Sequence, residues 1–107
     1  MSGSDRDLVF AALADSHRRL LLDRLRVANG QTLVELSAGL QISRQAVTKH
    51  LKVLEEAGLV LSRHRGRLRL HYLNPVPIHA VAMRWLEPFD RLPLDALAAA
   101  PEPDGGT

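Results

Sequence analysis

The feature that most constrains the fold is the stretch from Ser43 to Ala57, which reads SRQAVTKHLKVLEEA. Its apolar residues and one histidine recur at steps of three and four residues: Val47, His50, Leu51 and Leu54. At about 3.6 residues per turn these positions share one side of a helix, which predicts that this side faces a core. Ser43 is a favoured N-cap residue and Gly58 a favoured helix stop, so both ends of the helix are marked.

The opposite side of this helix gathers polar and cationic residues: Gln45, Thr48, Lys49 and Lys52, with Arg44 at the margin. Amide and hydroxyl groups can hydrogen-bond to base edges, and cations can bind phosphate. A short helix from Thr32 to Leu40 precedes it, with Gln41 and Ile42 as a tight turn, and two helices joined in this way predict a helix-turn-helix. Taken alone, the second helix is equally compatible with an ordinary amphipathic surface helix.

A hairpin is predicted after Gly58, where the apolar period changes to two. Leu59 to Arg63 forms the first strand, and the turn lies at His64–Arg67, where Gly66 tolerates a positive φ. In the second strand one face is apolar and the other cationic: Leu68, Leu70 and Tyr72 alternate with Arg67, Arg69 and His71. Four permanent cations crowd the tip, at Arg63, Arg65, Arg67 and Arg69, and their repulsion favours an anionic partner such as a DNA backbone. A solvated hairpin whose charges prevent edge pairing is the alternative.

The distribution of charge supports a polyanion-binding surface. The net charge of the 107 residues is only +2, but residues 41–74 hold seven Lys or Arg against two Glu. The absence of cysteine excludes disulfides and thiolate metal sites, and no Ser-His-Asp set, glycine-rich phosphate loop or pair of acids stands at motif spacing. We therefore expect no enzyme. The start of the chain does not read as a signal peptide and no segment is apolar enough to span a membrane, which predicts a cytosolic protein.

Two helices are expected before the helix-turn-helix, and one after the hairpin. The first runs from about Asp5 to Ala14, and the second, HRRLLLDRLRVA, is capped by Asp15 or Ser16. The last begins near Pro75 and carries a wide apolar stripe: Ile78, Val81, Ala82, Trp85, Leu86 and Phe89. Such a stripe is large for this domain, so we expect it to pack on a second copy, together with Leu8 and Val9; packing on its own domain is the alternative. Pro88 predicts a kink or an early end.

The order helix-helix-helix-helix, cationic hairpin, terminal helix is that of a winged helix-turn-helix, a mainly α fold with a small β-hairpin wing. In sequence, ALADSHRRLLLDRL, LVELSAGLQISRQAVTKHLKVLEEAGLV and SRHRGRLRLHYL resemble the ArsR family of bacterial transcriptional repressors, over about Phe10 to Trp85. The length predicts one domain, which we place at residues 1–97, followed by a tail at 98–107 whose composition predicts disorder. The resemblance implies a protein of the bacterial cytosol that is associated with the nucleoid.

The same resemblance implies a homodimer whose first and last helices form the interface, and whose two recognition helices enter successive major grooves. Bases would be read by Ser43, Arg44, Gln45, Thr48 and Lys49, with Lys52 beside them. Arg65, Arg67 and Arg69 of the wing would approach the backbone or minor groove, and Arg63 is a further DNA-binding candidate beside them. The operator would be an inverted repeat with half-sites about 10 bp apart or a close multiple.

Departures from the family pattern bear on what the protein senses. Members that sense arsenite or soft metals carry a cysteine pair where this chain has Glu35 to Ala38, and His79, Glu87 and Asp90 do not reproduce the ligand spacing of zinc or nickel sensors. The chain thus resembles the metal-independent branch, and we expect no metal, no cofactor and an unknown effector. A lone histidine on an apolar face, such as His50, is expected to be a packing residue.

The sequence therefore favours a dimeric DNA-binding regulator, most simply a repressor, with double-stranded DNA and its own second copy as partners. Two alternatives stay open. The apolar stripe of the last helix could accept a foreign helix, which would make the chain a protein interaction module. The regulator could also respond to a metal or small ligand through an effector site that the sequence does not reveal.

Overall fold

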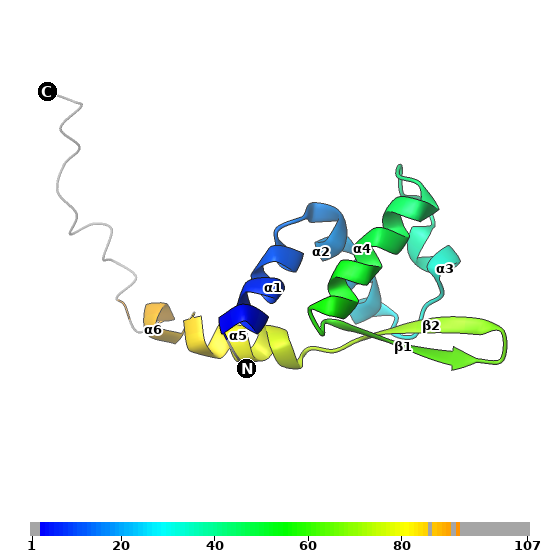
Figure 1. Ribbon diagram of the computed structural model, residues 1–107. Coiled ribbons are helices and arrows are strands. Elements are labelled where there is room, and N and C mark those ends of the chain that lie inside the picture. The colour runs from blue at the N-terminus through cyan, green and yellow to red at the C-terminus, as the bar shows by residue number, and fades with distance from the viewer. Residues whose placement is uncertain (1–2, 86, 91, 93–107) are drawn as a thin grey trace, which may run out of the picture.

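The computed structural model describes residues 3–85, 87–90 and 92, and shows a mainly helical fold with one two-stranded antiparallel hairpin (Figure 1). The elements in chain order are α1 (Gly3–Leu13), α2 (Ser16–Val27), α3 (Leu33–Ser37), α4 (Arg44–Glu56), β1 (Val60–Arg65), β2 (Leu68–Leu73), α5 (Val76–Trp85) and α6 (Glu87–Asp90). This confirms the winged helix-turn-helix and its element order. The four-residue α6 was not expected, and the tail at 98–107 lies outside the described residues.

The helix starts are set by side-chain caps. Asp15 is the N-cap of α2, since its Oδ1 atom accepts from the backbone N–H groups of His17 and Arg18 at 2.8 and 3.2 Å. At α3, Thr32 and Glu35 form the capping box that their spacing predicts. This helix is shorter than expected, because the chain leaves helical geometry at Ala38, where φ is −59° and ψ is 126°.

The bounds of α4 agree with the sequence. The Ser43 hydroxyl accepts from the backbone N–H of Ala46 at 3.0 Å, which caps the first turn. At the other end Gly58 has a φ of +75°, and the N–H of Leu59 donates to the carbonyl of Leu54 at 2.9 Å. This is the Schellman arrangement, in which a left-handed residue lets the following N–H groups satisfy the last carbonyls of the helix.

The hairpin is longer and its turn tighter than the sequence suggested. Val60 pairs with Leu73 at the base and Arg65 with Leu68 at the tip, which leaves only Gly66 and Arg67 as the loop, not the four residues of the expected turn. Gly66 has a φ of +63°, and no residue other than glycine has a positive φ in the described chain. A positive φ at the first loop position alone is the pattern of a type II′ turn, which requires glycine there.

The inner face of β2 is the one that carries Arg69 and His71. His71 is buried with 5% of its surface exposed, whereas Leu68 is 54% exposed. The reason is the pairing at the base of the wing: Val60 and Leu73 turn inward, and the alternation of side chains then sends His71 and Arg69 to the same inner face. The apolar face of Leu68, Leu70 and Tyr72 is the outer one.

The hydrophobic core lies between the helices and the base of the hairpin. Its fully buried residues come from five elements and a connecting loop: Val9, Leu21, Leu25, Leu36, Val47, Leu54, Leu59 and Val60. Helix α5 packs against α1, with Val81 in the core, and ends at Trp85, which agrees with the early end expected near Pro88. The wing and α5 project from opposite ends of the molecule (Figure 1).

Candidate nucleic-acid interface

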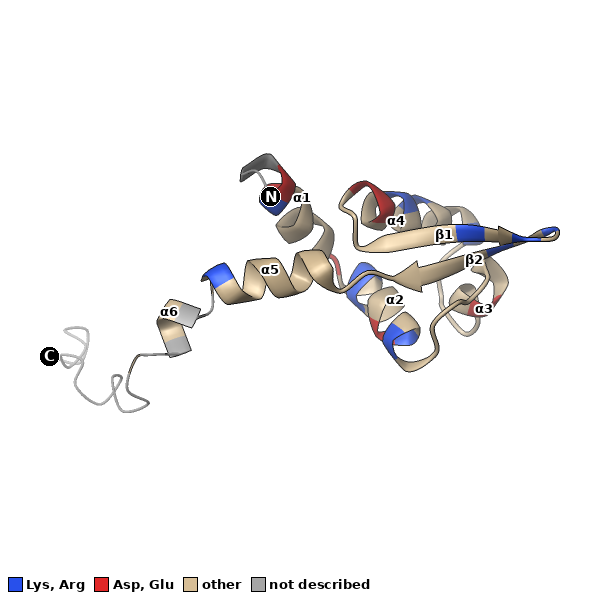
Figure 2. Cartoon of the chain, turned by 90° about the horizontal axis from the view of Figure 1, so that it is seen from below, with Lys and Arg blue, Asp and Glu red and all other residues tan. Residues whose placement is uncertain are grey.

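The outer side of α4 is a continuous polar and cationic surface. All six side chains expected to contact DNA from this helix and its cap are exposed: Ser43, Arg44, Gln45, Thr48, Lys49 and Lys52. The opposite side is buried through Val47, Leu51 and Leu54, so the core fixes which residues face outward. Figure 2 shows basic residues along α4 and at the wing, while acidic residues mark the last turn of α4.

The polar groups on this surface are not equally available. Ser43 uses its hydroxyl oxygen as the helix cap, and the Thr48 hydroxyl donates to the carbonyl of Arg44 at 2.9 Å, within the same helix. Gln45 is exposed and its side chain makes no hydrogen bond to another described residue. Its amide, which both donates and accepts, is therefore the neutral group best placed to recognise a base edge.

The four arginines of the wing fall into distinct environments. Arg63 and Arg65 lie on the outer face, and Arg67 lies in the two-residue loop. Neither Arg65 nor Arg67 has a hydrogen-bond or ion-pair partner in the part of the chain that the structure describes. Arg69 differs, because its Nη2 atom donates to both carboxylate oxygens of Glu55 at 3.3 Å. Arg69 thus links the wing to α4, and the free cations of the wing are concentrated at its tip and outer face.

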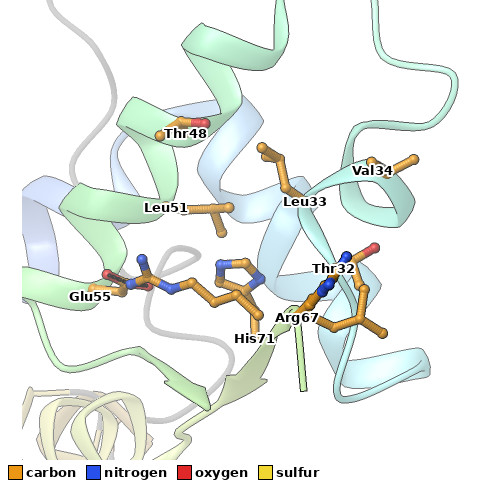
Figure 3. Close-up of a pocket in the computed structure, with 10 residues that line it drawn as sticks. Thr32, Leu33, Val34, Thr48, Leu51, Glu55, Arg67 and His71 are labelled. Carbon is orange, nitrogen blue, oxygen red and sulfur yellow. Dashed lines mark hydrogen bonds and ion pairs between the residues drawn. The ribbon is translucent and has the colours of Figure 1, made fainter. Parts of the chain in front are cut away.

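An open cavity of about 310 Å³ separates the wing from the recognition helix (Figure 3). Thr48 and Leu51 of α4 lie along one wall, and Arg67 and His71 of β2 and its loop lie along another. Glu55 and Arg69 also line the cavity, so their ion pair spans from α4 to the wing. The wing therefore stands away from the exposed end of α4, which leaves both elements free to meet one partner.

The base of the wing is anchored by a contact that the sequence did not reveal. The backbone of Gln31 pairs with that of His71, through bonds of 2.8 and 3.2 Å, and acts as a short third strand. The His71 ring also lies with Nδ1 3.0 Å from the Gln31 carbonyl. A single residue between α2 and α3 has no strand periodicity, so no sequence signal could have indicated this pairing.

An aromatic surface lies on α1, α5 and α6, away from the wing. Phe10 contacts Trp85 edge to face with ring centroids 6.1 Å apart, and Trp85 contacts Phe89 at 5.2 Å. Trp85 and Phe89 are each 55% exposed. Phe10, 43% exposed, was not among the residues expected at a dimer interface, although it belongs to the same surface. Leu8, 46% exposed, lies on another side of α1, where it lines a hollow with Glu56 and Pro77.

The other residues expected at the dimer interface lie differently. Val9 and Val81 are 0% and 7% exposed and pack in the core of their own chain. They are therefore not part of the exposed aromatic surface. Ile78 and Ala82 are half-buried, and Leu86 lies outside the described residues. The described residues include no helix long and apolar enough to cross a membrane.

Comparisons with known proteins point to one class of protein. The helix-turn-helix domain family matches residues 13–63. The uncharacterized HTH-type transcriptional regulator YuzN of Bacillus subtilis is 44% identical over 93 residues, which cover 81% of this chain and all of the relative. The arsenic resistance transcriptional regulator ArsR1 of Pseudomonas putida is 30% identical over 105 residues, covering 89% of this chain and 81% of the relative. A solved ArsR family transcriptional regulator, RHA00566, superposes with a TM-score of 0.74 at 28% identity, covering 84% of this chain and 92% of that one.

Proposed function

Because this chain belongs to the ArsR family of helix-turn-helix transcriptional regulators, we propose that it is a homodimeric repressor that recognises an inverted-repeat operator. The observation that carries the proposal is the exposed outer side of α4 beside the unpaired wing cations Arg65 and Arg67. A regulator of this kind acts on chromosomal DNA in the bacterial cytosol. The chain has no cysteine, so it belongs with the members that lack the cysteine metal site.

The side chains divide into two roles in this proposal. Arg44, Gln45 and Lys49 contact base edges in the major groove, while Ser43, Thr48 and Lys52 approach the sugar-phosphate backbone or the thymine methyl group. Arg63, Arg65 and Arg67 bind phosphate or enter the minor groove. Arg69 acts through Glu55 by holding the wing over α4, since its guanidinium is already paired.

The second copy covers the aromatic surface. Phe10, Trp85 and Phe89 are each more than two-fifths exposed, and their ring contacts join them into an apolar patch across three helices. Burial of such a patch is favourable, and the commonest way for identical chains to bury one patch is a twofold dimer. With α1 and α5 at the twofold axis, the two wings extend outward on opposite sides, and the recognition helices can reach half-sites about one helical turn apart.

The decisive experiment is fluorescence anisotropy of the purified protein with its own promoter region and with a scrambled duplex, at two salt concentrations. A preference of about a thousandfold or more for the promoter, with both affinities falling as salt rises, is the expected result. Equal, salt-sensitive binding to the two duplexes would contradict sequence recognition.

The exposed aromatic surface also supports a second candidate, an interaction module that binds the helix of another protein. Light scattering separates the two proposals. A stable dimer at micromolar concentration covers the surface and leaves no site for a foreign helix. A monomer that fails to bind the promoter would favour the interaction module.

A further inference from the structure

The side chain of Arg18, near the start of α2, joins three elements of the fold. Its Nε atom donates to the carbonyl of Ala12 at 2.8 Å and its Nη2 atom to that of Ala11 at 3.0 Å, both in the last turns of α1. Its Nη1 atom lies 3.2 Å from Nδ1 of His50, in the middle of α4. Only 17% of the side chain is exposed. Within the described residues no other side-chain hydrogen bond reaches α4 from α1 or α2.

The two ends of this contact belong to the two functional surfaces. Carbonyls in the last turn of a helix lack partners within the helix, so the guanidinium both satisfies them and compensates the negative end of the α1 dipole. Helix α1 carries Phe10 of the aromatic surface. Helix α4 carries the DNA-contacting side chains, and His50 lies on its inner side. Arg18 is therefore the direct polar connection between the proposed dimer interface and the recognition helix.

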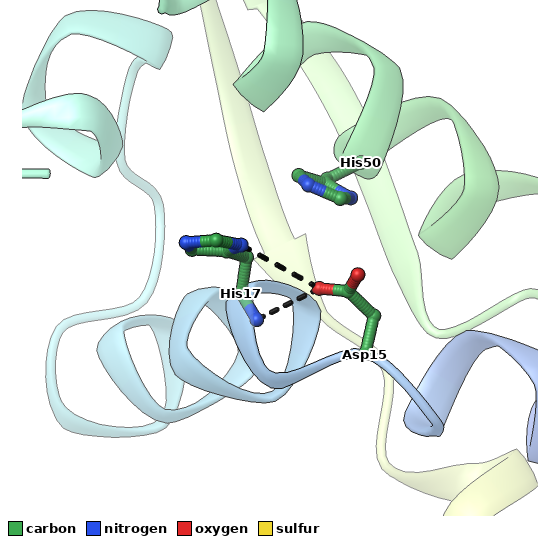
Figure 4. Close-up of side chains that lie close together, drawn as sticks. All are labelled: Asp15, His17 and His50. Atoms are coloured by element: carbon green, nitrogen blue, oxygen red, sulfur yellow. Dashed lines mark hydrogen bonds and ion pairs between the residues drawn. The ribbon is translucent and has the colours of Figure 1, made fainter. Parts of the chain in front are cut away.

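His50 has the chemistry that this contact needs. An arginine side chain has only donors, so Nδ1 of His50 must present its lone pair, and the ring hydrogen then lies on Nε2. The ring of His17 stacks on that of His50 with centroids 5.6 Å apart and an angle of 30° between the planes (Figure 4). Asp15 lies next to His17 and Arg18, with Oδ1 3.8 Å from Nδ1 of His17 and Oδ2 4.0 Å from Nη1 of Arg18.

Aspartate and histidine are also side chains of the kind that bind transition metals, and Asp15, His17 and His50 each offer a ligand atom within 4.8 Å of the others. A metal with bonds of about 2.1 Å needs any two ligand atoms within roughly 4.2 Å, so the three side chains would have to close in by a few tenths of an ångström to bind one, which the guanidinium between them prevents. The guanidinium of Arg18 touches two of its three members and supplies a permanent positive charge there. Arg18 thus takes the place that a cation would hold.

We propose that Arg18 is a positioning residue for DNA recognition, which fixes the recognition helix relative to α1 by serving as the cation of the Asp15–His17–His50 cluster. The inference rests on the proposed function as a dimeric DNA-binding protein. In a dimer, the orientation of α4 relative to α1 sets the distance between the two recognition helices. Loss of the contact should therefore weaken simultaneous binding to two half-sites and leave binding to one half-site intact.

Two variants of His50 test the hydrogen bond without disturbing the bonds of Arg18 to Ala11 and Ala12. His50→Asn can place its side-chain oxygen where Nδ1 lies, whereas His50→Leu cannot accept a hydrogen bond. Affinity is measured on the footprinted operator and on a duplex with one half-site scrambled. For His50→Leu we expect a loss of about tenfold on the full operator, within the range of coupling free energies between sites, and less than about twofold on the single half-site. His50→Asn should retain wild-type affinity for both.

The same experiment separates this inference from the function on which it rests. Equal affinities of His50→Leu and His50→Asn for the operator, or equal losses on full and half operators, would overturn the positioning role. If the wild-type protein itself fails to prefer its promoter, the proposed function fails first. Circular dichroism and light scattering confirm that each variant is folded and dimeric before its affinity is compared.

Replacement of Arg18 gives a second test, which distinguishes its role as the cation of the cluster from a role in packing alone. Arg18→Met removes the guanidinium from the cluster, so Co²⁺ should bind there and show visible d–d absorption. Zn²⁺ should restore the operator affinity of this variant to within about threefold of wild type, because the metal again joins α2 to α4. Arg18→Met with His17→Ala should show neither effect, and the wild-type protein should show no Co²⁺ band at the same concentration. A band in the wild type, or none in Arg18→Met, would overturn the assignment of Arg18 as the cation of this cluster.

Discussion

The Nη2 atom of Arg69 lies 3.3 Å from each carboxylate oxygen of Glu55, and this pair is the polar contact between the wing and the recognition helix. The side chains of Arg69 and Glu55 are 52% and 26% exposed, so the pair contributes only about 0–1 kcal/mol to the free energy of unfolding. Its importance is geometric, because it joins the outer half of the hairpin to the last turn of α4.

Glu55→Gln should therefore change DNA binding more than stability. The substitution releases Arg69 to bind phosphate, so we expect tighter binding to a scrambled duplex, a salt dependence steeper by about one phosphate contact, and weaker discrimination of the operator. Glu56→Gln is the matched control, since Glu56 is exposed and has the same charge but no partner on the wing. If both variants raise affinity for scrambled DNA equally, the pair has no role beyond its charge.

Arg67→Ala should weaken binding to all sequences alike. Arg67 lies in the two-residue loop at the tip of the wing without a partner among the described residues, so it is free to contact phosphate. We expect the slope of log K against log salt to fall by about one unit, with little change in melting temperature. A loss confined to the operator would instead assign Arg67 to base recognition.

Gln45→Ala should weaken binding to the operator by about 1–3 kcal/mol and leave binding to scrambled DNA nearly unchanged, because a good base contact contributes that much discrimination. Gln41→Ala, another exposed glutamine in the turn before α4, is the control and should have no effect. Anisotropy titrations of both variants on both duplexes provide the comparison. Equal losses on the two duplexes would remove Gln45 from the set of base-reading residues.

Trp85→Ala should increase the dissociation constant of the dimer at least tenfold. The substitution removes an aromatic side chain that is 55% exposed and contacts both Phe10 and Phe89, and large aromatic residues dominate interface energetics. Val27→Ala, on a 78% exposed residue of α2, serves as the control for loss of apolar surface elsewhere. Sedimentation or light scattering over a dilution series measures the change, and an unchanged dimer would place the interface elsewhere.

Acid should destabilise the fold through two capping carboxyls. Burial raises the pKa of Asp15, but hydrogen bonds from the backbone N–H groups of Arg18 and His17, together with nearby positive charge, lower it more, so its pKa lies below the ordinary value of 3.8. Hydrogen bonds from the backbone N–H and side chain of Thr32 lower the pKa of Glu35 below 4.5. A carboxyl with a lower pKa in the folded state contributes stability above its unfolded pKa and loses it as the pH falls through the folded pKa.

We therefore expect the free energy of unfolding, measured by urea denaturation, to fall as the pH drops from about 5 to below 4. Asp15→Asn keeps an N-cap acceptor but has no charge to titrate, so its stability should depend less on pH in this range. An unchanged pH dependence in this variant would mean that other carboxyls dominate acid unfolding.

The sequence predicted the elements whose ends carry local signals. Ser43, Gly58 and the Thr32–Glu35 capping box each act within a few residues, and the structure confirms all three. Which face of β2 lies inward could not be predicted, because it depends on how the base of the wing packs on the core, where His71 pairs with Gln31, forty residues away in the chain. The cluster around Arg18 was missed for the same reason: Asp15 and His50 meet only when α2 packs on α4.

The pairing of Gln31 with His71 also bears on how such regulators could diversify. The hairpin is clamped at its root, while its outer half, from Arg63 to Leu68, is exposed. Two residues inserted in each strand would preserve the alternation of side chains and lengthen the arm by roughly 7 Å. A longer wing could thus fit a groove of different shape without any change in the outer side of α4 or in the aromatic surface. The outer half of the wing is therefore the part of this fold that can change most easily when a new DNA site is to be bound.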